Sequence, residues 1–185
     1  METKAEFRAH LKARRDALRE DDRAAWSQAI CGHLDRLCRN RQFTRIGAFW
    51  PLGSELDLRP AVTAHPDRLW LFPRVASTHP PRLAWGTAPL EQGPWGLMEP
   101  TLAPHALPPV QLLLVPGLAF DGQGHRLGYG RGFYDALLAK LPEDVLTLGV
   151  GFEAQMHLPV PVEPHDWPVR GLLSECGLRL LQAEG

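Results

Sequence analysis

Two segments near the start of the chain carry apolar residues at helical intervals. Thr3 and Glu6 have the spacing of a capping box and stand directly before the first of these segments. We expect amphipathic helices over residues 4 to about 20 and about 22 to 38. The apolar positions lie three, four or seven residues apart: Phe7, Leu11 and Leu18 in the first segment, and Trp26, Ile30, Leu34 and Leu37 in the second. Beside the first apolar stripe, Lys4, Arg8 and Arg15 share a second face.

Short apolar runs typical of β-strands follow. They cover residues 45–50, 68–75, 82–86, 110–115 and 145–152, with a last short run at 170–175. The run 110–115 is uninterruptedly apolar, which is typical of a strand buried on both faces, and we expect the run 145–152 to be buried as well. Pro73 is expected to weaken the end of the second run, because proline offers no N–H to a ladder.

Helical segments alternate with these strands. Another helix is expected over residues 132–141, whereas residues 87–109 are rich in Pro and Gly and are expected to form irregular covering structure. The alternation predicts an α/β domain with a mainly parallel sheet. No internal repeat or low-complexity linker divides the chain, so residues 1–185 are predicted to be a single domain.

Composition narrows the function classes only slightly. Of 185 residues, 44% are hydrophobic and 22% charged, as is usual for a globular protein. The net charge of −1 is too small to predict attraction to nucleic acid or to a membrane surface. Any anion site must therefore be local.

The three cysteines, Cys31, Cys38 and Cys176, show no metal-ligand spacing and are expected to be buried thiols in a reducing compartment. The charged N-terminal segment lacks an apolar signal core, and no long apolar run occurs. We expect a cytoplasmic protein.

The stretch Gly117–Ala139, GLAFDGQGHRLGYGRGFYDALLA, combines glycines, arginines and the start of a helix. No Gly-Lys-Ser/Thr follows the glycines, which excludes a Walker-type phosphate loop. Twelve residues, 116–127, separate Val115 from Gly128, which excludes the tight strand-to-helix turn of a dinucleotide fingerprint.

An anion cradle of another kind remains the favoured interpretation. Alternating glycines let a backbone approach a ligand closely, and a helix begins directly after them. Arg126 and Arg131 add fork-shaped donors suited to phosphate oxygens. For Asp135 the spacing leaves two roles open: a first-turn acid that stabilises the helix dipole, or a ligand for Mg²⁺.

The ordered motif VPGLAFDGQGHRLGYGRGFYDALL resembles the signature of the 5-formyltetrahydrofolate cyclo-ligase family, also called methenyltetrahydrofolate synthetases. The resemblance extends over nearly the whole chain, through KAEFR, GAFWPLGSELD, WGLMEP and LPVPVEPHDWPV. It implies a three-layer α/β/α fold on a scaffold similar to those of sugar-phosphate isomerases and CoA transferases.

The resemblance also implies an enzyme that uses ATP and Mg²⁺. ATP would phosphorylate the formyl oxygen on N5 of 5-formyltetrahydrofolate, N10 would attack, and phosphate would leave as the 5,10-methenyl bridge forms. The implied partner is this folate, with or without a polyglutamate tail, and no nucleic acid or membrane. A monomer or weak homodimer is expected.

Residue roles carry over by matching positions in the motif. Nucleotide contacts are implied for Lys4, Arg8, Arg126, Leu127, Gly128, Tyr129, Gly130, Arg131, Gly132, Phe133 and Tyr134. Folate contacts are implied for Trp50, Glu55, Tyr129, Gly130, Arg131, Gly132 and Phe133. The expected catalytic residues are Arg126, Arg131 and Tyr134, and the expected metal ligands are Asp135 and Asp166. Arg14 and Arg15 receive no role.

Several of these residues would also suit a purely structural role. Lys4 and Arg8 would also suit a solvated helix face, Glu55 a helix cap or surface position, Trp50 the core, and Asp166 a turn. The sequence departs from the family pattern at Phe133, where tyrosine is frequent, and at Arg131, where glycine or lysine is frequent. Two rival functions are a sugar-phosphate isomerase or CoA-transferase relative and a non-catalytic folate- or nucleotide-binding regulator.

Overall fold

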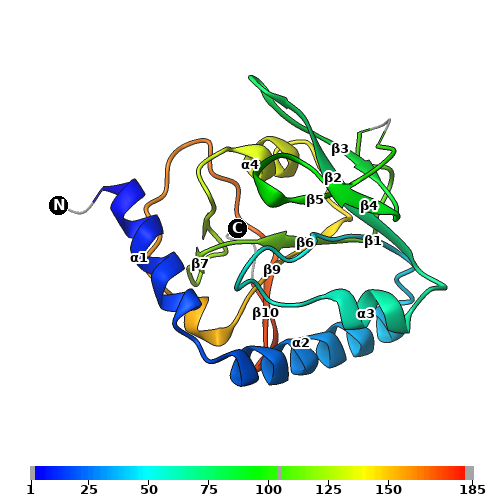
Figure 1. Ribbon diagram of the computed structural model, residues 1–185, viewed down its shortest axis with the longest axis horizontal. Helices are drawn as coiled ribbons and strands as arrows, with labels where there is room; N and C mark the ends of the chain where they lie inside the picture. The colour runs from blue at the N-terminus through cyan, green and yellow to red at the C-terminus, as the bar shows by residue number, and fades with distance from the viewer. Residues whose placement is uncertain (1–2, 104–105, 182–185) are drawn as a thin grey trace.

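A seven-stranded sheet in the strand order β11-β10-β9-β6-β1-β2-β3 organises the protein (Figure 1). The computed structural model describes residues 3–103 and 106–181. The strands are β1 Arg45–Gly47, β2 Leu69–Thr78, β3 Pro81–Gly86, β6 Leu112–Pro116, β9 Leu146–Val150, β10 Gly171–Ser174 and β11 Gly177–Leu180. The ladders from β10 through β9, β6 and β1 to β2 are parallel, and the two edge strands, β3 and β11, pair antiparallel. The predicted mainly parallel sheet is confirmed.

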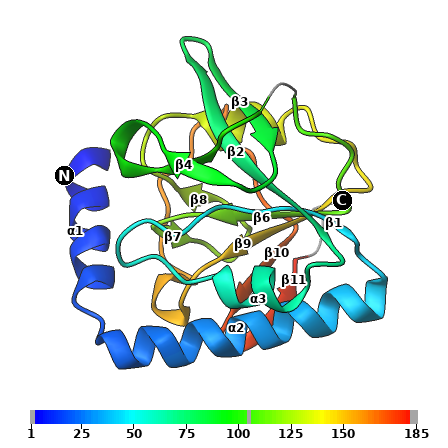
Figure 2. The ribbon, with the colours of Figure 1, turned by 45° about the vertical axis from the view of Figure 1, so that its right-hand side comes forward.

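Within the described residues, four α-helices accompany the sheet: α1 Lys4–Asp16, α2 Glu20–Arg41, α3 Arg59–Ala64 and α4 Phe133–Leu138. The predicted capping box opens α1, where the Thr3 hydroxyl accepts from the N–H of Glu6 and the Glu6 carboxylate accepts from that of Thr3. The first helix ends at Asp16 rather than at residue 20, and the second runs on to Arg41. A turn thus separates them, and Figure 2 shows α1 upright at the left while α2 lies along the bottom.

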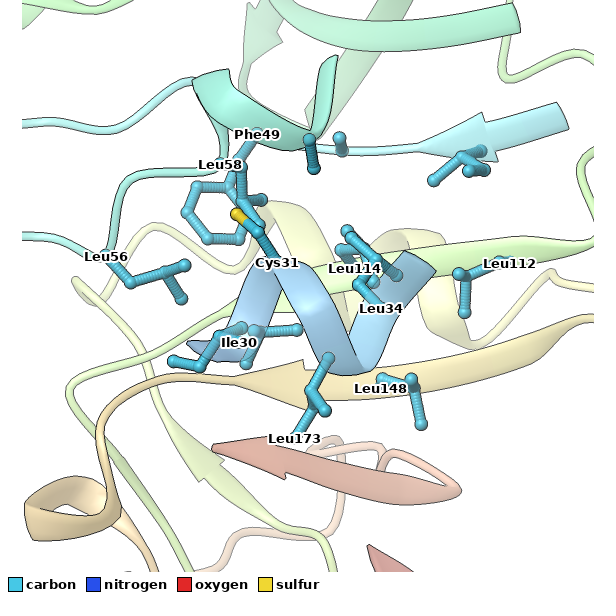
Figure 3. Packing of buried hydrophobic residues seen from close by; sticks show 14 of the residues in the cluster. Ile30, Cys31, Leu34, Phe49, Leu56, Leu58, Leu112, Leu114, Leu148 and Leu173 are labelled. Carbon is cyan, nitrogen blue, oxygen red and sulfur yellow. The ribbon is translucent and has the colours of Figure 1, made fainter. Parts of the chain in front are cut away.

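Alternate residues of the central strands build two cores on opposite faces of the sheet. Leu112 and Leu114 of β6 are fully buried against Ile30 and Leu34 of α2 (Figure 3). The intervening Leu113 and Val115 of β6 are equally buried on the other face, in the cluster that includes Leu138 of α4. This period of two matches a strand covered on both sides, and the three-layer α/β/α fold is confirmed.

Several short elements differ from the sequence-based prediction. The segment expected to be irregular contains the antiparallel pair β4 Leu90–Gln92 and β5 Met98–Pro100, joined through the 3-10 turn Pro94–Gly96; its residues 104–105 lie outside the described part. The glycine-rich stretch contains a second small pair, β7 Ala119–Phe120 and β8 Arg126–Leu127. A 3-10 turn, Glu153–Gln155, follows β9. Elements of two or three residues are too short to show a hydrophobic period.

The prediction that Pro73 weakens its strand was wrong, because β2 continues through it to Thr78. The parallel ladder with β1 ends at the pair Gly47 and Leu71, and beyond it β2 pairs with β3, where Pro73 lies opposite Trp85. The missing N–H therefore falls where β2 has already left its parallel partner.

All three cysteines are free thiols, and Cys31 and Cys38 are buried as predicted. Cys176 is exposed, so the prediction of a third buried thiol was wrong. It stands in the turn between β10 and the edge strand β11. Within residues 3–103 and 106–181, no helix combines the length and the apolar character needed to cross a bilayer.

Candidate active site

A cavity of about 410 Å³ lies beyond the carboxyl ends of the central strands. Its wall includes Phe49 and Trp50, which follow β1, and Pro116, which ends β6. Ligands of open parallel sheets bind at this edge. The wall also holds all the residues with expected site roles: Lys4, Arg8, Trp50, Glu55, Arg126, Leu127, Gly128, Tyr129, Gly130, Arg131, Gly132, Phe133, Tyr134, Asp135 and Asp166. Segments distant in sequence thus converge on one volume.

The glycines of the loop between β8 and α4, called the glycine loop below, have different structural roles. Gly130 and Gly132 adopt positive φ values of 84° and 68°, which side chains rarely tolerate. Gly128 has no positive φ, and a Cβ placed there would meet nothing within 4 Å, so its missing side chain leaves open space at the cavity wall.

Arg8 fastens α1 to this loop. Its Nε donates to the carbonyl of Gly128 at 3.0 Å. A Cβ built on Gly130 would lie 3.1 Å from Arg8 Cζ, which is tighter than ordinary contact. Arg8 is therefore packed against the glycine loop rather than on a solvated helix face.

Lys4 lies close to the C-terminal acids of the cavity wall. Its Nζ is 3.0 Å from Glu163 Oε2 and 3.8 Å from Asp166 Oδ2. Asp166 Oδ2 also accepts from the N–H of Glu163 at 2.8 Å, so the turn role considered for this acid exists beside its place in the cavity.

Arg126 and Asp135 form an ion pair in the wall, with Nη2 and Oδ1 3.0 Å apart. The guanidinium side chain is 5% exposed and the carboxylate 21%. Arg126 Nη1 donates to the carbonyl of Trp167, and the N–H of Trp167 donates to Asp135 Oδ1 at 3.4 Å. The described contacts of Asp135 thus use one carboxylate oxygen, and Arg126 holds the acid in place.

Arg131 stacks on an aromatic ring at the cavity wall. Its Cζ lies 3.7 Å from the centroid of Trp95, within the distance of a cation–π contact. Trp95 itself is 48% exposed and belongs to the 3-10 turn between β4 and β5. The contact joins the glycine loop to the turn between β4 and β5.

Glu55 is buried in the wall, with a side chain that is 8% exposed. The Tyr129 hydroxyl donates to its Oε1, and the N–H of Leu52 donates to its Oε2 at 2.9 Å. Burial raises the pKa of Glu55, while the bonds from Tyr129 and Leu52 and the charge of Arg15 act in the opposite direction. Glu55 is not a surface residue, because its side chain is buried. It does not cap α3 either, because Leu58 occupies the N-cap position.

Two aromatic residues, Trp50 and Tyr134, also line the cavity. Trp50 packs edge-on against Phe72 with ring centroids 5.6 Å apart, so it belongs to the core and to the cavity together. The Tyr134 hydroxyl is buried and has no hydrogen-bond partner within the described residues. Burial raises its pKa, which keeps the hydroxyl protonated and able to donate.

Residues without an expected role also shape the site. The segment that contains the 3-10 turn and β5 also lines the cavity, through Trp95, Leu97, Met98 and Glu99. The resemblance of WGLMEP to the family pattern was the signal that could have found them. Arg15 is 3% exposed and bonded to Tyr129. In the sequence it shares a face with Lys4 and Arg8, which does not by itself reveal its burial.

Glu163, His165 and Asp166 bring their ligand atoms within 4.8 Å of one another, close enough to hold a metal ion. His165 had no metal-ligand spacing in the sequence, and Asp135 is not a member of this group. Asp135 and Asp166 nevertheless line the same cavity.

The fold and the site define an α/β protein with a polar and aromatic cavity beyond the carboxyl ends of its parallel strands. Cations, carboxylates and aromatic rings share its wall, and the glycine loop leaves space for a ligand. Residues 1–175 match the model of the 5-formyltetrahydrofolate cyclo-ligase family, and the chain belongs to this family. The family predicted from the sequence is confirmed.

Named relatives agree with this membership. The chain is 31% identical to a 5-formyltetrahydrofolate cyclo-ligase of Mycolicibacterium smegmatis, over 89% of both chains. An NMR structure of Aquifex aeolicus 5,10-methenyltetrahydrofolate synthetase superposes with a TM-score of 0.82 at 29% identity, covering 98% of this chain and 94% of that one. A synthetase from Mycoplasma pneumoniae, 18% identical with a TM-score of 0.73, covers 93% and 98% and shares the fold.

Proposed function

We propose that this protein converts 5-formyltetrahydrofolate to 5,10-methenyltetrahydrofolate with the consumption of ATP in the presence of Mg²⁺. The terminal phosphoryl group passes from ATP to the formyl oxygen, leaving ADP. N10 then attacks the formyl carbon, its proton is lost, and the carbon–oxygen bond breaks to release phosphate.

One observation carries the proposal: the residues that match the family's nucleotide, folate and metal positions line a single cavity. They come from α1, from the segment after β1, from β8 with the glycine loop and α4, and from the turn that contains Asp166. Chance convergence of four such segments on one volume would be unexpected for residues with unrelated roles. The volume of about 410 Å³ is typical of a small-molecule site.

The cationic residues would bind and orient the phosphates. Lys4, Arg8, Arg126 and Arg131 stand around the glycine loop and would offset the negative charge that spreads over the transferred group. The open space at Gly128 lets a ligand approach the backbone. Arg131 would exchange its contact with Trp95 for a phosphate contact or keep the ring as one wall of the site.

The part of the wall that contains Glu55 and Trp50 would hold the folate. The buried Glu55 carboxylate suits the adjacent amino and ring N–H donors of a pterin, and Trp50 offers an indole face to an aromatic ring. The Tyr134 hydroxyl, which has no partner within the described residues, would donate to an oxygen of a bound reactant. These groups position the reactants, which is the main requirement of phosphoryl transfer.

The donor set fits a hard divalent cation. Asp135 and Asp166 supply carboxylate oxygens beside the phosphate-binding cations, and Mg²⁺ prefers such oxygens together with those of a phosphate. Bound there, Mg²⁺ would screen the charge of the phosphates. Arg126 would keep Asp135 oriented through the oxygen that it already contacts.

We further propose a cytoplasmic monomer or weak homodimer that acts on a small-molecule substrate, with or without a polyglutamate tail. The free thiols suit a reducing compartment. The near-zero net charge gives no support to nucleic acid or a membrane as a partner.

The test is to mix the purified protein with 5-formyltetrahydrofolate and Mg-ATP and follow the absorbance of the methenyl product and the release of ADP. Formation of both in equal amounts is expected. Binding without turnover would instead identify the non-catalytic regulator. Turnover of a sugar phosphate or acyl-CoA but not of the folate would identify the rival enzyme class.

A further inference from the structure

Arg15 is a buried cation that lies behind the folate wall of the cavity. It is 3% exposed, although it belongs to α1, whose neighbouring Arg14 is exposed. Its Nε donates to Ser54 Oγ at 3.0 Å and its Nη1 to the Tyr129 hydroxyl at 3.0 Å. The same Nη1 lies 3.7 Å from Glu55 Oε1. One guanidinium thus joins three segments of the chain.

The position of Arg15 relative to the cavity is informative. Arg15 does not belong to the wall of the large cavity, whereas Glu55 does. Both residues line a second, much smaller cavity of about 10 Å³, together with Gln155. Glu55 therefore stands between the two cavities, and Arg15 contacts it from the side away from the ligand space.

Burying a guanidinium is costly unless carboxylates or other acceptors surround it. The fork of an arginine can satisfy several acceptors in a fixed geometry, which a lysine ammonium does less well. Here the guanidinium contacts both members of the directly bonded pair formed by the Tyr129 hydroxyl and the Glu55 carboxylate. The N–H of Leu52 holds the second carboxylate oxygen, and Arg15 adds a charged contact at the oxygen that Tyr129 shares.

We propose that Arg15 is a positioning residue for the folate: it orients Glu55 and Tyr129 in the cavity wall so that the carboxylate faces the donors of the pterin. The inference rests on the proposed function, because it assigns Glu55 to the folate. Arg15 touches neither reactant and acts through the two residues that it holds.

A pH effect accompanies this geometry. The charged and titratable groups that face Glu55 are Arg15 from α1, Tyr129 from the glycine loop and Tyr134 from α4. Burial raises the pKa of Glu55, and the positive charge of Arg15 opposes that rise. Removing the charge must raise the pKa of Glu55 further, so protonation of the carboxylate begins at higher pH.

The experiment compares Arg15→Met and Arg15→Lys with the matched control Arg14→Met on the exposed neighbour. KM and kcat are measured separately for 5-formyltetrahydrofolate and for ATP across pH. For Arg15→Met we expect KM for the folate to rise at least about tenfold, the effect of losing a charge-assisted hydrogen bond. KM for ATP should stay within about twofold, since uniform damage to the site would raise both.

The acidic limb of the kcat/KM profile for the folate should move to higher pH in Arg15→Met and return towards wild type in Arg15→Lys. A second readout needs no turnover: the pKa of Glu55, followed by the ¹³C shift of its carboxyl carbon and assigned with Glu55→Gln. It should rise in Arg15→Met and stay unchanged in Arg14→Met. If Arg15→Met folds poorly, Arg15→Gln, which also removes the charge, provides the same comparison.

Two outcomes overturn the inference in distinguishable ways. If the wild-type protein forms no methenyl product, the proposed function fails and the inference fails with it. If the wild-type protein turns over the folate while Arg15→Met behaves like Arg14→Met, only the inference fails. Equal increases in KM for the folate and for ATP would also overturn it, because they would make Arg15 a general support of the fold.

Discussion

The Tyr134 hydroxyl is a buried polar group without a partner within the described residues. Such a group costs about 1–3 kcal/mol of stability unless a ligand satisfies it. We expect Tyr134→Phe to leave the free energy of unfolding unchanged or to raise it by about 1 kcal/mol, while kcat falls about tenfold. Urea unfolding and steady-state kinetics measure the two effects.

The matched control is Tyr129→Phe. The Tyr129 hydroxyl bonds Glu55 and Arg15, so its removal should lower stability. A loss of stability in Tyr134→Phe comparable to that of Tyr129→Phe would show that the Tyr134 hydroxyl has a structural partner.

Asp135 is held by Arg126 and stands in the first turn of α4, so it could serve the fold or the metal. We expect Asp135→Asn to lower kcat at least about a hundredfold and to raise the Mg²⁺ concentration needed for half-maximal activity, because a charged ligand is lost. The amide oxygen can still accept from Arg126. Tm should therefore fall by no more than about 4 °C, as for a loss near 1 kcal/mol.

Activity titrated with Mg²⁺ and a thermal melt check this prediction together. Asp135→Ala, which removes both charge and acceptor, is the control and should lower Tm further. A large loss of stability in Asp135→Asn with an unchanged Mg²⁺ requirement would assign Asp135 to the Arg126 pair alone.

At the scale of an element, two glycines of the loop between β8 and α4 lack a side chain for different reasons. Gly130 adopts a positive φ, whereas Gly128 faces open space. Gly130→Ala should lower the free energy of unfolding by about 1–2 kcal/mol, because its φ of 84° is unfavourable for alanine and its Cβ would press on Arg8. Gly128→Ala meets open space and should cost less than about 0.5 kcal/mol. Its methyl group would point into ligand space, so KM for ATP should rise. Equal stability of the two variants would contradict the strain at Gly130.

Elements with a clear hydrophobic period could be predicted, and shorter ones could not. The stripes in α1 and α2 and the apolar run of β6 appear directly in the sequence. The pairs β4–β5 and β7–β8 and the edge strand β11 are two to four residues long, and antiparallel pairing with a neighbouring segment, rather than a hydrophobic period, defines them.

The residues of the candidate site also divide into those that the sequence could predict and those that it could not. The motif resemblance selected residues that the fold brings to one cavity. Arg15 could not be assigned, because a helical face does not reveal whether loops fold over it. Its burial depends on Ser54, Glu55 and Tyr129, which lie 39, 40 and 114 positions away along the chain.

For the whole molecule, the layer between α2 and the sheet protects two thiols. Burial raises the pKa of Cys31 and raises that of Cys38 to about 11, so both are protonated thiols at neutral pH and covered as well. In the native protein we expect an alkylating reagent to modify Cys176 first, because only the thiolate of an accessible cysteine reacts. Denaturation should expose all three.

Peptide mass spectrometry after timed alkylation measures this order. Cys176→Ser should then show almost no native labelling, which serves as the control. Labelling of Cys31 or Cys38 at the rate of Cys176 would mean that α2 opens freely from the sheet.

The cavity draws its wall from residue 4 to residue 166 of the chain. During synthesis, Lys4 and Arg8 are made first, and the glycine loop against which Arg8 packs follows 120 residues after it. Asp166, with its contact to Lys4, comes later still. A nascent chain therefore carries no complete cavity until almost all of it has left the ribosome.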